Sequence, residues 1–220
     1  MIIEWLGHSC FKLVSDTGHT FLFDPYDPSY TGLEHEKIDA DVVLMSHGHG
    51  DHGAIHQVKN YKKVIKSAGT YEYEDVKIKA IKSFHDPKNG ALRGENLIFV
   101  LSIGSLNICH FGDIGQNLTE KQINEIGNVD IILIPIGGIY TIDALQAKEF
   151  INILNPKVTI PMHFKIKNLK FDLNYLSDFL DLFEEKDIEI VNGDSVKITK
   201  NNLENMPKVL VFGFNRAIKK

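Results

Sequence analysis

The chain has 220 residues, 43% of them hydrophobic and 24% charged, which is the composition of an ordinary globular protein rather than a disordered or fibrous one. The length suits one sizeable core, so we expect a single domain over residues 1–220. The formal net charge of -5 and the lack of a basic stripe argue against nucleic acid as a partner. No apolar run approaches the ~20 residues that a membrane span needs, so we expect no membrane partner.

The cysteines and the N-terminal residues give evidence on the cellular location of the protein. Cys10 and Cys109 are far apart and neither has a neighbouring Cys, so no disulfide framework is indicated. The N-terminus reads directly as a strand and lacks a basic segment followed by an apolar one, so we expect no signal peptide. Both observations favour a cytoplasmic location.

Short strand-like runs, separated by turn residues, fill the first half of the chain. We expect strands at Ile2–Trp5, Phe11–Val14, Phe21–Asp24, Val42–Met45, Val76–Ile81, Leu97–Ile103 and Leu106–Phe111. Leu97–Leu101 and Ile131–Ile134 are near-continuous apolar runs, which is typical of strands that are buried on both faces.

Helical patterns appear mainly after the midpoint. The periodicity predicts helices over Thr119–Ile126, from a cap at Thr141 to Leu154, and over Asn174–Glu185. Strand-like runs close the chain at Ile188–Val191, Val196–Thr199 and Val209–Phe212. Strands interleaved with helices predict a layered α/β protein.

The segment from His47 to His52, His-Gly-His-Gly-Asp-His, is rich in metal-binding side chains. His47 and His49 are two residues apart, so in extended backbone they project to the same side. A turn at Asp51 and His52 directs these two toward a second point. Imidazole and carboxylate together suit zinc, and also manganese or iron. The alternative is a solvated, His-rich loop without metal.

Four apolar runs end in further candidate ligands. They lead into His47, into His85, into His110 and then Asp113, and into His163. Strand ends that lie side by side share one edge of a sheet, so these side chains should converge on a rigid platform.

These residues resemble the metallo-β-lactamase superfamily, and their order and spacing fit along essentially the whole chain. The branch that the chain resembles is that of small, single-domain zinc-dependent hydrolases related to L-ascorbate-6-phosphate lactonase. The supporting stretches are Trp5–Phe11, Phe23–Pro25, His110–Asp113, Pro135–Thr141 and Ile160–His163. The resemblance implies a four-layer αββα sandwich of two mixed β-sheets with outer helices, and a site at one end of the sheets.

The resemblance also implies seven ligands shared by two zinc ions, with manganese or iron as alternatives. They are His47, His49 and His85 for the first ion, Asp51, His52 and His163 for the second, and Asp113 bridging both. A hydroxide shared by two such ions attacks a carbonyl or phosphoryl centre. His110 competes with His85 for the third position on the first ion. We favour His85 because the family order places this ligand a full hairpin before the bridging Asp.

Five residues are candidates for supporting roles, and Asp51 and His8 are the candidates for catalytic groups beyond metal binding. His8 either faces the metals, assisting proton transfer or substrate binding, or bonds the backbone. Asp24 and His110 are candidates for orienting metal ligands. Arg93, Asn96 and Tyr140 are candidates for the substrate pocket, where Arg93 suits a phosphate or carboxylate. The alternatives are a turn that Asp24 opens before Pro25, a solvated surface position for Arg93, and a strand-to-helix turn at Tyr140.

Differences between this chain and other branches of the superfamily limit the reactions that we expect it to catalyse. The oxygen-reducing diiron branch has Glu where this chain has His49, and one group of true β-lactamases has Cys where this chain has Asp113. There is no room for the inserted domain of nucleic-acid-processing members. We therefore expect a dinuclear hydrolase of a small, anionic ester, lactone or phosphoester.

Two other functions stay open. One is a phosphodiesterase with a phospholipid- or nucleotide-like substrate, and the other is a metal-dependent binding or sensor protein without turnover. The motif specifies a reactive centre and not what it attacks. A homo-oligomer also stays open, although no exposed apolar helix face marks an interface.

Overall fold

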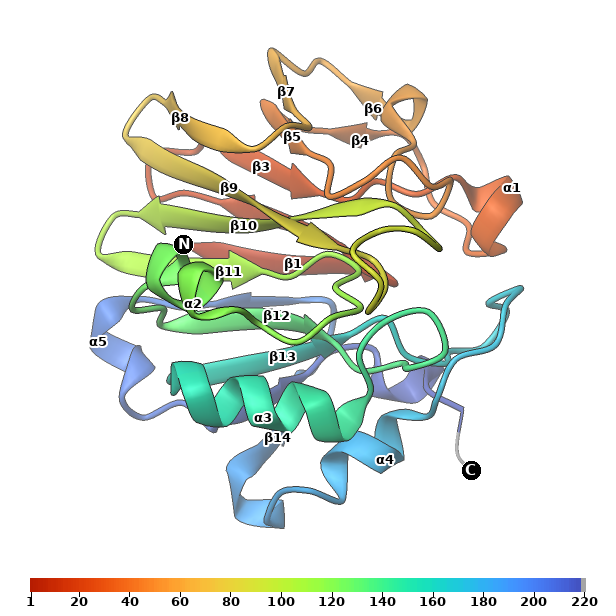
Figure 1. The fold of residues 1–220 in the computed structure, drawn as a ribbon. Coiled ribbons are helices and arrows are strands. Elements are labelled where there is room, and N and C mark those ends of the chain that lie inside the picture. The colour runs from red at the N-terminus through yellow and green to blue at the C-terminus, as the bar shows by residue number, and fades with distance from the viewer. Residues whose placement is uncertain (219–220) are drawn as a thin grey trace.

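The computed structural model describes residues 1–218 and contains two large mixed sheets packed face to face (Figure 1). The first sheet has the strand order β15-β1-β2-β3-β5-β7. Its members are β1 (Ile2–Gly7), β2 (Cys10–Val14), β3 (Thr20–Phe23), β5 (Val42–Leu44), β7 (Lys63–Ile65) and β15 (Ser195–Lys197). The first strands pair in antiparallel fashion, and β3, β5 and β7 pair in parallel.

The second sheet has the order β14-β16-β13-β12-β11-β10-β9-β8. Its members are β8 (Gly69–Tyr73), β9 (Val76–Phe84), β10 (Glu95–Ile103), β11 (Leu106–His110), β12 (Ile131–Pro135), β13 (Val158–Met162), β14 (Ile188–Ile190) and β16 (Val209–Val211). Pairing is antiparallel from β8 to β11 and parallel from β11 to β14. The two mixed sheets confirm the expected metallo-β-lactamase sandwich.

The main core fills the space between the sheets and explains the sequence patterns. In β9, Val76, Ile78 and Ala80 are buried while the lysines between them are exposed, as expected for a strand with one solvated face. β12 is buried at every position, which confirms the expectation for Ile131–Ile134. Cys10 and Cys109 are both buried and free.

Helices cover the outer face of the second sheet, where α2 lies against β9 and α3 against β12 (Figure 1). The helices are α1 (Pro28–Thr31), α2 (Glu120–Ile126), α3 (Ala144–Leu154), α4 (Leu176–Leu180) and α5 (Lys200–Leu203), with 3-10 turns at Ile55–Gln57, Glu185–Asp187 and Phe214–Arg216. No helix in residues 1–218 has the length and apolar character needed to cross a membrane.

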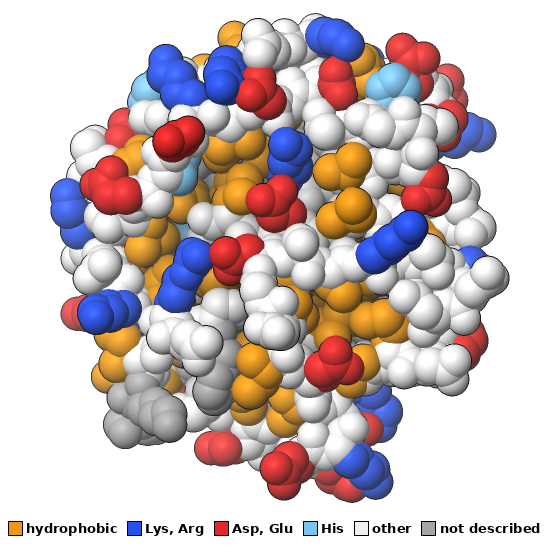
Figure 2. Space-filling model, turned by 180° about the vertical axis from the view of Figure 1, so that it is seen from behind, with side chains coloured by type: hydrophobic (Ala, Val, Ile, Leu, Met, Phe, Trp, Pro, Cys, Tyr) orange, Lys and Arg blue, Asp and Glu red, His pale blue; other side chains and the backbone are white. Residues whose placement is uncertain are grey.

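The outer face of the first sheet is covered differently. Here a small two-stranded ribbon, β4 (Ile38–Asp39) and β6 (Val58–Lys59), packs on Cys10, Leu22 and Val43 to form a second apolar cluster. The space-filling view from this side shows hydrophobic side chains at the surface among charged ones (Figure 2). Short segments rather than long helices therefore make up this outer layer.

Two helix boundaries differ from expectation. α3 is capped by Asp143 and not by Thr141, because Asp143 and Gln146 form a capping box with each other's backbone N–H. The helix predicted over Asn174–Glu185 is only five residues long, Leu176–Leu180. Its start is displaced because the backbone of Asn174 bonds Gly137 and Lys165 instead of a helical turn. Its end tightens into i→i−3 bonds up to Phe183.

Candidate metal centre

Four strand ends meet at one edge of the sandwich. β5 leads into the loop that carries residues 47–52, and β9, β11 and β13 end at or shortly before His85, Asp113 and His163. These three strands run in the same direction, because antiparallel β10 separates β9 from β11 and the others pair in parallel. Their carboxyl ends therefore share one edge, and residues that are far apart in the sequence come together.

Asp113 lies at the centre of this edge. Its carboxylate Oδ2 lies 3.1 Å from Nε2 of His52, 3.1 Å from Nε2 of His163 and 3.3 Å from Nε2 of His85. Nε2 of His47 is 4.0 Å from the same oxygen. Burial opposes ionisation, but His163 and His52 hold the pKa of Asp113 well below its ordinary value. One buried carboxylate is thus surrounded by four imidazole nitrogens.

The backbone of Asp113 is held from beneath by Asn96. Asn96 Oδ1 accepts the backbone N–H of Asp113 at 2.9 Å, and Asn96 Nδ2 donates to Ser83 Oγ at 2.7 Å and to the Phe111 carbonyl at 2.9 Å. The preceding Gly112 has φ of 54°, and a Cβ there would lie 2.4 Å from Asn96 Oδ1. Asn96 is fully buried, so it supports Asp113 rather than lining the pocket.

Asp24 holds the histidines on the opposite side. Its Oδ2 accepts from His52 Nδ1 at 2.9 Å and from Ser46 Oγ at 2.7 Å, and its Oδ1 accepts the backbone N–H of Ser46 at 2.7 Å. The single hydroxyl hydrogen of Ser46 is used on Asp24, so His47 Nδ1, 2.9 Å from Ser46 Oγ, donates to that oxygen. Nε2 of His47 and of His52 therefore both face Asp113.

The residues fit a metal ion at this position. With Nδ1 of His52 donating to Asp24, Nε2 of His52 offers a lone pair toward a carboxylate oxygen, and a cation must lie between them. In the protein without metal a proton fills this role: burial lowers the pKa of His52, but the carboxylates of Asp113 and Asp51 outweigh burial and raise it well above its ordinary value. Buried Nε2 of His47 and Oδ1 of Asp113 have no hydrogen-bond partner in the described chain. The donor atoms around Asp113 therefore favour the binding of a cation.

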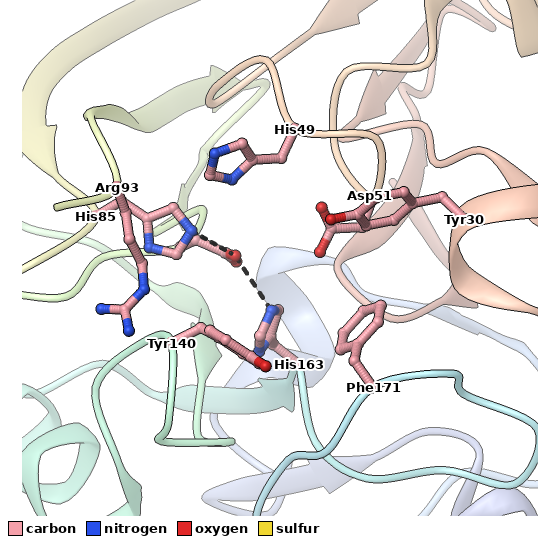
Figure 3. Close-up of a pocket in the computed structure, with 9 residues that line it drawn as sticks. Tyr30, His49, Asp51, His85, Arg93, Tyr140, His163 and Phe171 are labelled. Atoms are coloured by element: carbon pink, nitrogen blue, oxygen red, sulfur yellow. Dashed lines mark ion pairs between the residues drawn. The ribbon is translucent and has the colours of Figure 1, made fainter.

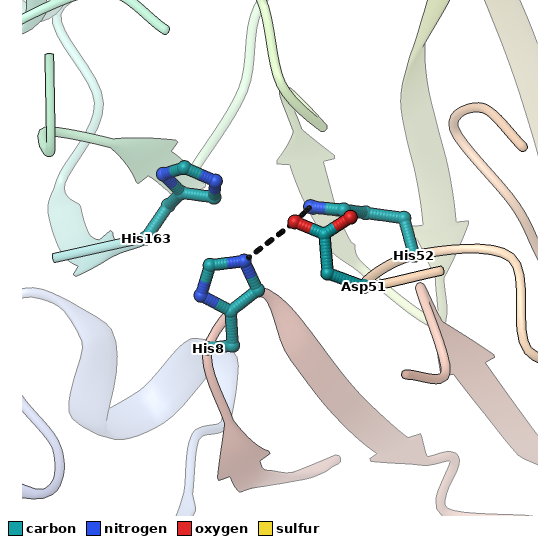
Figure 4. Close-up of side chains that lie close together, drawn as sticks. All are labelled: His8, Asp51, His52 and His163. Carbon is teal, nitrogen blue, oxygen red and sulfur yellow. Dashed lines mark ion pairs between the residues drawn. The ribbon is translucent and has the colours of Figure 1, made fainter. Parts of the chain in front are cut away.

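The candidate ligands form two groups beside Asp113, and a third set, His47, His52 and Asp113, joins them. In each group the ligand atoms lie within 4.8 Å of one another. The shallow group is His47, His49 and His85; the deep group is His8, Asp51, His52 and His163 (Figure 4). His49 is exposed, whereas every member of the deep group is buried.

The third position of the shallow group is occupied by His85 and not by His110. His110 lies outside both groups, with Nε2 donating to the Ser9 carbonyl at 3.0 Å and Nδ1 accepting the backbone N–H of Gly112 at 3.0 Å. Its ring stacks on Phe23 at a centroid distance of 4.6 Å. His110 thus contacts the turn that carries Asp113, and its supporting role stays a prediction.

Left-handed backbone recurs at the centre. His8, Asp24 and His163 have φ of 53°, 45° and 54°, a conformation that side-chain-bearing residues seldom adopt. Each such residue costs on the order of 1–3 kcal/mol and persists where the surroundings enforce it, typically at functional sites. The three side chains reach Asp51, His52 and Asp113 as a result.

A cavity of about 260 Å³ opens above Asp113 and is lined by members of both groups (Figure 3). Tyr30, Tyr140, Phe171 and Arg93 line it together with His49, Asp51, His85, Asp113 and His163. The Arg93 guanidinium lies 5.5 Å from the Tyr140 ring centroid and donates to the Ile139 carbonyl at 3.2 Å. Arg93 forms no ion pair with any residue in 1–218, so its charge is free to meet a ligand.

Several functional candidates were missing from the sequence prediction. Tyr30 and Phe171 lie in loops with no pattern that marks them. Ser46, directly before His47, could have been identified from its position. Buried Asp86 accepts four backbone N–H groups, from Lys88, Gly90, Leu92 and Arg93, and so fixes the Arg93 loop. In the sequence, this loop is indicated by the turn residues Pro-Lys-Asn-Gly that follow Asp86.

A sandwich of two mixed sheets with a His/Asp cluster at one sheet edge defines a metal-binding enzyme fold of the metallo-β-lactamase type. A family model described as β-lactamase superfamily domain matches residues 2–163. The chain therefore belongs to the metallo-β-lactamase superfamily.

Relatives support this assignment over most of the chain. A protein of Carboxydothermus hydrogenoformans named a metal-dependent hydrolase is 33% identical over 74% of this chain and 84% of its own length. A protein of Thermoplasma acidophilum with the same description is 32% identical over 76% and 84%. A crystal structure from Thermotoga maritima, of a protein proposed to be a Zn-dependent hydrolase of this superfamily, is 40% identical, covers 96% of this chain and 97% of its own, and has a TM-score of 0.79.

Proposed function

We propose that this chain is a metal-dependent hydrolase that holds two metal ions and acts on a small anionic ester, lactone or phosphoester. The names of its relatives support metal-dependent hydrolysis. The observation that carries the two-ion proposal is Asp113, whose Oδ2 lies between the shallow group and the deep group. One carboxylate can then serve both ions.

The protein contributes a fixed ligand set and a shaped cavity. His47, His49 and His85 would hold one ion, Asp51, His52 and His163 the other, and Asp113 both. When bound, two such ions supply a hydroxide nucleophile at neutral pH and stabilise developing negative charge on oxygen. The Asp24 carboxylate keeps the His52 ring oriented throughout.

The cavity favours a small substrate with a negative charge. Its volume of about 260 Å³ is at the lower end for small-molecule sites. Arg93 presents an unpaired guanidinium on the same side as the shallow group, and its backbone is fixed by Asp86. A carboxylate or phosphate bound to Arg93 would place the adjoining scissile bond over Asp113.

The test combines metal content with turnover. Purified protein is analysed for its metals and screened with 4-nitrophenyl esters, lactones and bis(4-nitrophenyl) phosphate, beside Asp113→Asn. We expect about two zinc or manganese ions per chain, fewer in the variant, and hydrolysis that follows metal content. Less than one equivalent of metal per chain in the native protein would contradict the proposal.

The same screen separates the other functions. Hydrolysis of bis(4-nitrophenyl) phosphate without any lactone or ester turnover would indicate a phosphodiesterase. A protein that holds two ions and stays inactive on every substrate class would indicate a metal-dependent binding or sensor protein.

A further inference from the structure

His8 is a buried histidine that the seven-residue ligand set leaves without a role. It lies in the turn between β1 and β2, and only 1% of its surface is exposed. Within residues 1–218 its Nδ1 has no hydrogen-bond partner, and its Nε2 has only the Asp51 carboxylate, 3.4 Å away and without hydrogen-bond geometry. Buried imidazole nitrogens are normally paired, so the protein alone satisfies this ring poorly.

The backbone is built to aim this ring inward. His8 has φ of 53°, and Gly7 before it has φ of 120°. The Trp5 indole N–H donates to the His8 carbonyl at 3.0 Å, and the Tyr26 hydroxyl donates to the Leu6 carbonyl at 2.8 Å. Two buried donors thus hold the turn in a backbone conformation that costs free energy. This conformation directs the His8 imidazole toward the interior.

The ring faces the deep group. His8 Nε2 lies 3.4 Å from Asp51 Oδ2, close to the 3.6 Å between His52 Nε2 and the same oxygen (Figure 4). The His8 ring centroid is 4.2 Å from that of His163 and 5.2 Å from that of His52. Donor atoms that share one zinc or manganese ion at 2.0–2.3 Å lie roughly 3–4.5 Å apart, so these separations suit a common ion.

We propose that His8 is a direct ligand of the deep metal ion, beside Asp51, His52 and His163. This inference rests on the proposed function and deepens it. With Asp113 shared, the deep ion would have five protein donors and the shallow ion four. Asp51 and His163 of the deep group line the cavity together with His49 and His85 of the shallow group. The larger donor set would hold the deep ion more firmly and leave more open positions for substrate on the shallow ion.

The decisive experiment observes the bond itself. Metal-free protein labelled with ¹⁵N at histidine is loaded with two equivalents of ¹¹³Cd, and ¹¹³Cd–¹⁵N scalar couplings are recorded by NMR. His8→Asn identifies the His8 signal and suits the backbone, because Asn tolerates positive φ. His8→Gly, which is free of this restriction, replaces it if the Asn variant does not fold. His56→Asn, on the surface, is the control for loss of a histidine.

We expect a coupling from cadmium to His8 that is absent in His8→Asn and present in His56→Asn. In a zinc titration with a competing chelator, His8→Asn should bind the tighter ion at least about 10-fold more weakly, the size of effect seen when a supporting group is lost. Absence of any cadmium coupling to His8 in the fully loaded wild-type protein would overturn the proposal and leave His8 as a neighbour of Asp51. If the wild-type protein binds no metal, the proposed function fails first and this inference with it.

Discussion

The deep group and the shallow group both consist mainly of histidines, but only the deep group has a carboxylate of its own, Asp51. Every member of the deep group is buried, whereas the shallow group combines buried His85 with half-buried His47 and exposed His49. The deep group draws on the β1–β2 turn, the loop after β5 and the end of β13. The shallow group needs only that loop and the end of β9.

The difference indicates a division of labour at one carboxylate. A ligand set with many buried protein donors is typical of an ion that stays in place, and an open position is what a reacting centre requires. Asp113 links the two, so the enclosed side can fix the geometry at which the open side works.

Complete removal of metal should have the largest effect. We expect EDTA to abolish hydrolysis in two phases, with the ion at exposed His49 released before the ion at buried His52. An ion present at about 1,000 times its Kd stabilises the fold by about 4 kcal/mol, so full removal should lower Tm by on the order of 10 °C. Calorimetry and metal analysis along a dialysis series measure both. Release of both ions in one step would break the comparison.

Asp113→Asn should affect both groups at once. Loss of the shared negative charge should weaken both ions and reduce kcat/KM by on the order of 10²–10³, the effect of removing one key electrostatic group. Inductively coupled plasma analysis and steady-state kinetics measure the two effects. Retention of one full equivalent of metal would mean that Asp113 serves a single ion.

Asp24→Asn should act more strongly on the deep group than on the shallow group. Asp24 bonds His52 directly but reaches His47 only through Ser46, so its loss should weaken the deep ion by about 10–100-fold and the shallow ion less. The matched control is Asp41→Asn, because Asp41 also accepts strand hydrogen bonds, from Thr20, but at the opposite end of the sheet. Competitive zinc titrations give both affinities. Equal weakening of the two ions would argue against separate groups.

Arg93→Gln should act on the shallow side with the smallest effect. Loss of the guanidinium should raise KM for a carboxylate-bearing ester by about 10-fold, the size of one charge-assisted hydrogen bond. A neutral ester and the metal content should be unaffected. Lys88→Gln, an exposed cation of the same loop, is the control. A similar KM increase for the neutral ester would remove Arg93 from substrate recognition.

The sequence predicts best those elements whose residues carry one dominant signal. Buried strands such as β10 and β12 are apolar throughout, and each ligand follows directly at a strand end, so both fold and candidate ligands could be read together. β4, β6 and β7 were missed because strands of two or three residues contain too little periodicity. β8 was missed although Tyr71 and Tyr73 alternate with polar residues.

The site was less predictable where the position of a side chain depends on contacts with residues far away in the sequence. The stripe from Tyr175 to Phe183 reads as one helix, yet turns continue the packing after Leu180. Tyr30 and Phe171 reach the cavity from loops whose course depends on the whole fold. The position of His8 depends on hydrogen bonds from Trp5 and Tyr26 around it, which no local pattern encodes.

The chain has a single tryptophan, and its indole N–H is bonded to the His8 carbonyl. The same ring stacks on Phe164, directly after His163, at a centroid distance of 6.2 Å. Trp5 is therefore hydrogen-bonded to one member of the deep group and packs against the residue that follows another. Its fluorescence can therefore report which group is filled. A quenching ion such as Co²⁺ should reduce the emission much more when it binds at the deep group than when it binds at the shallow group.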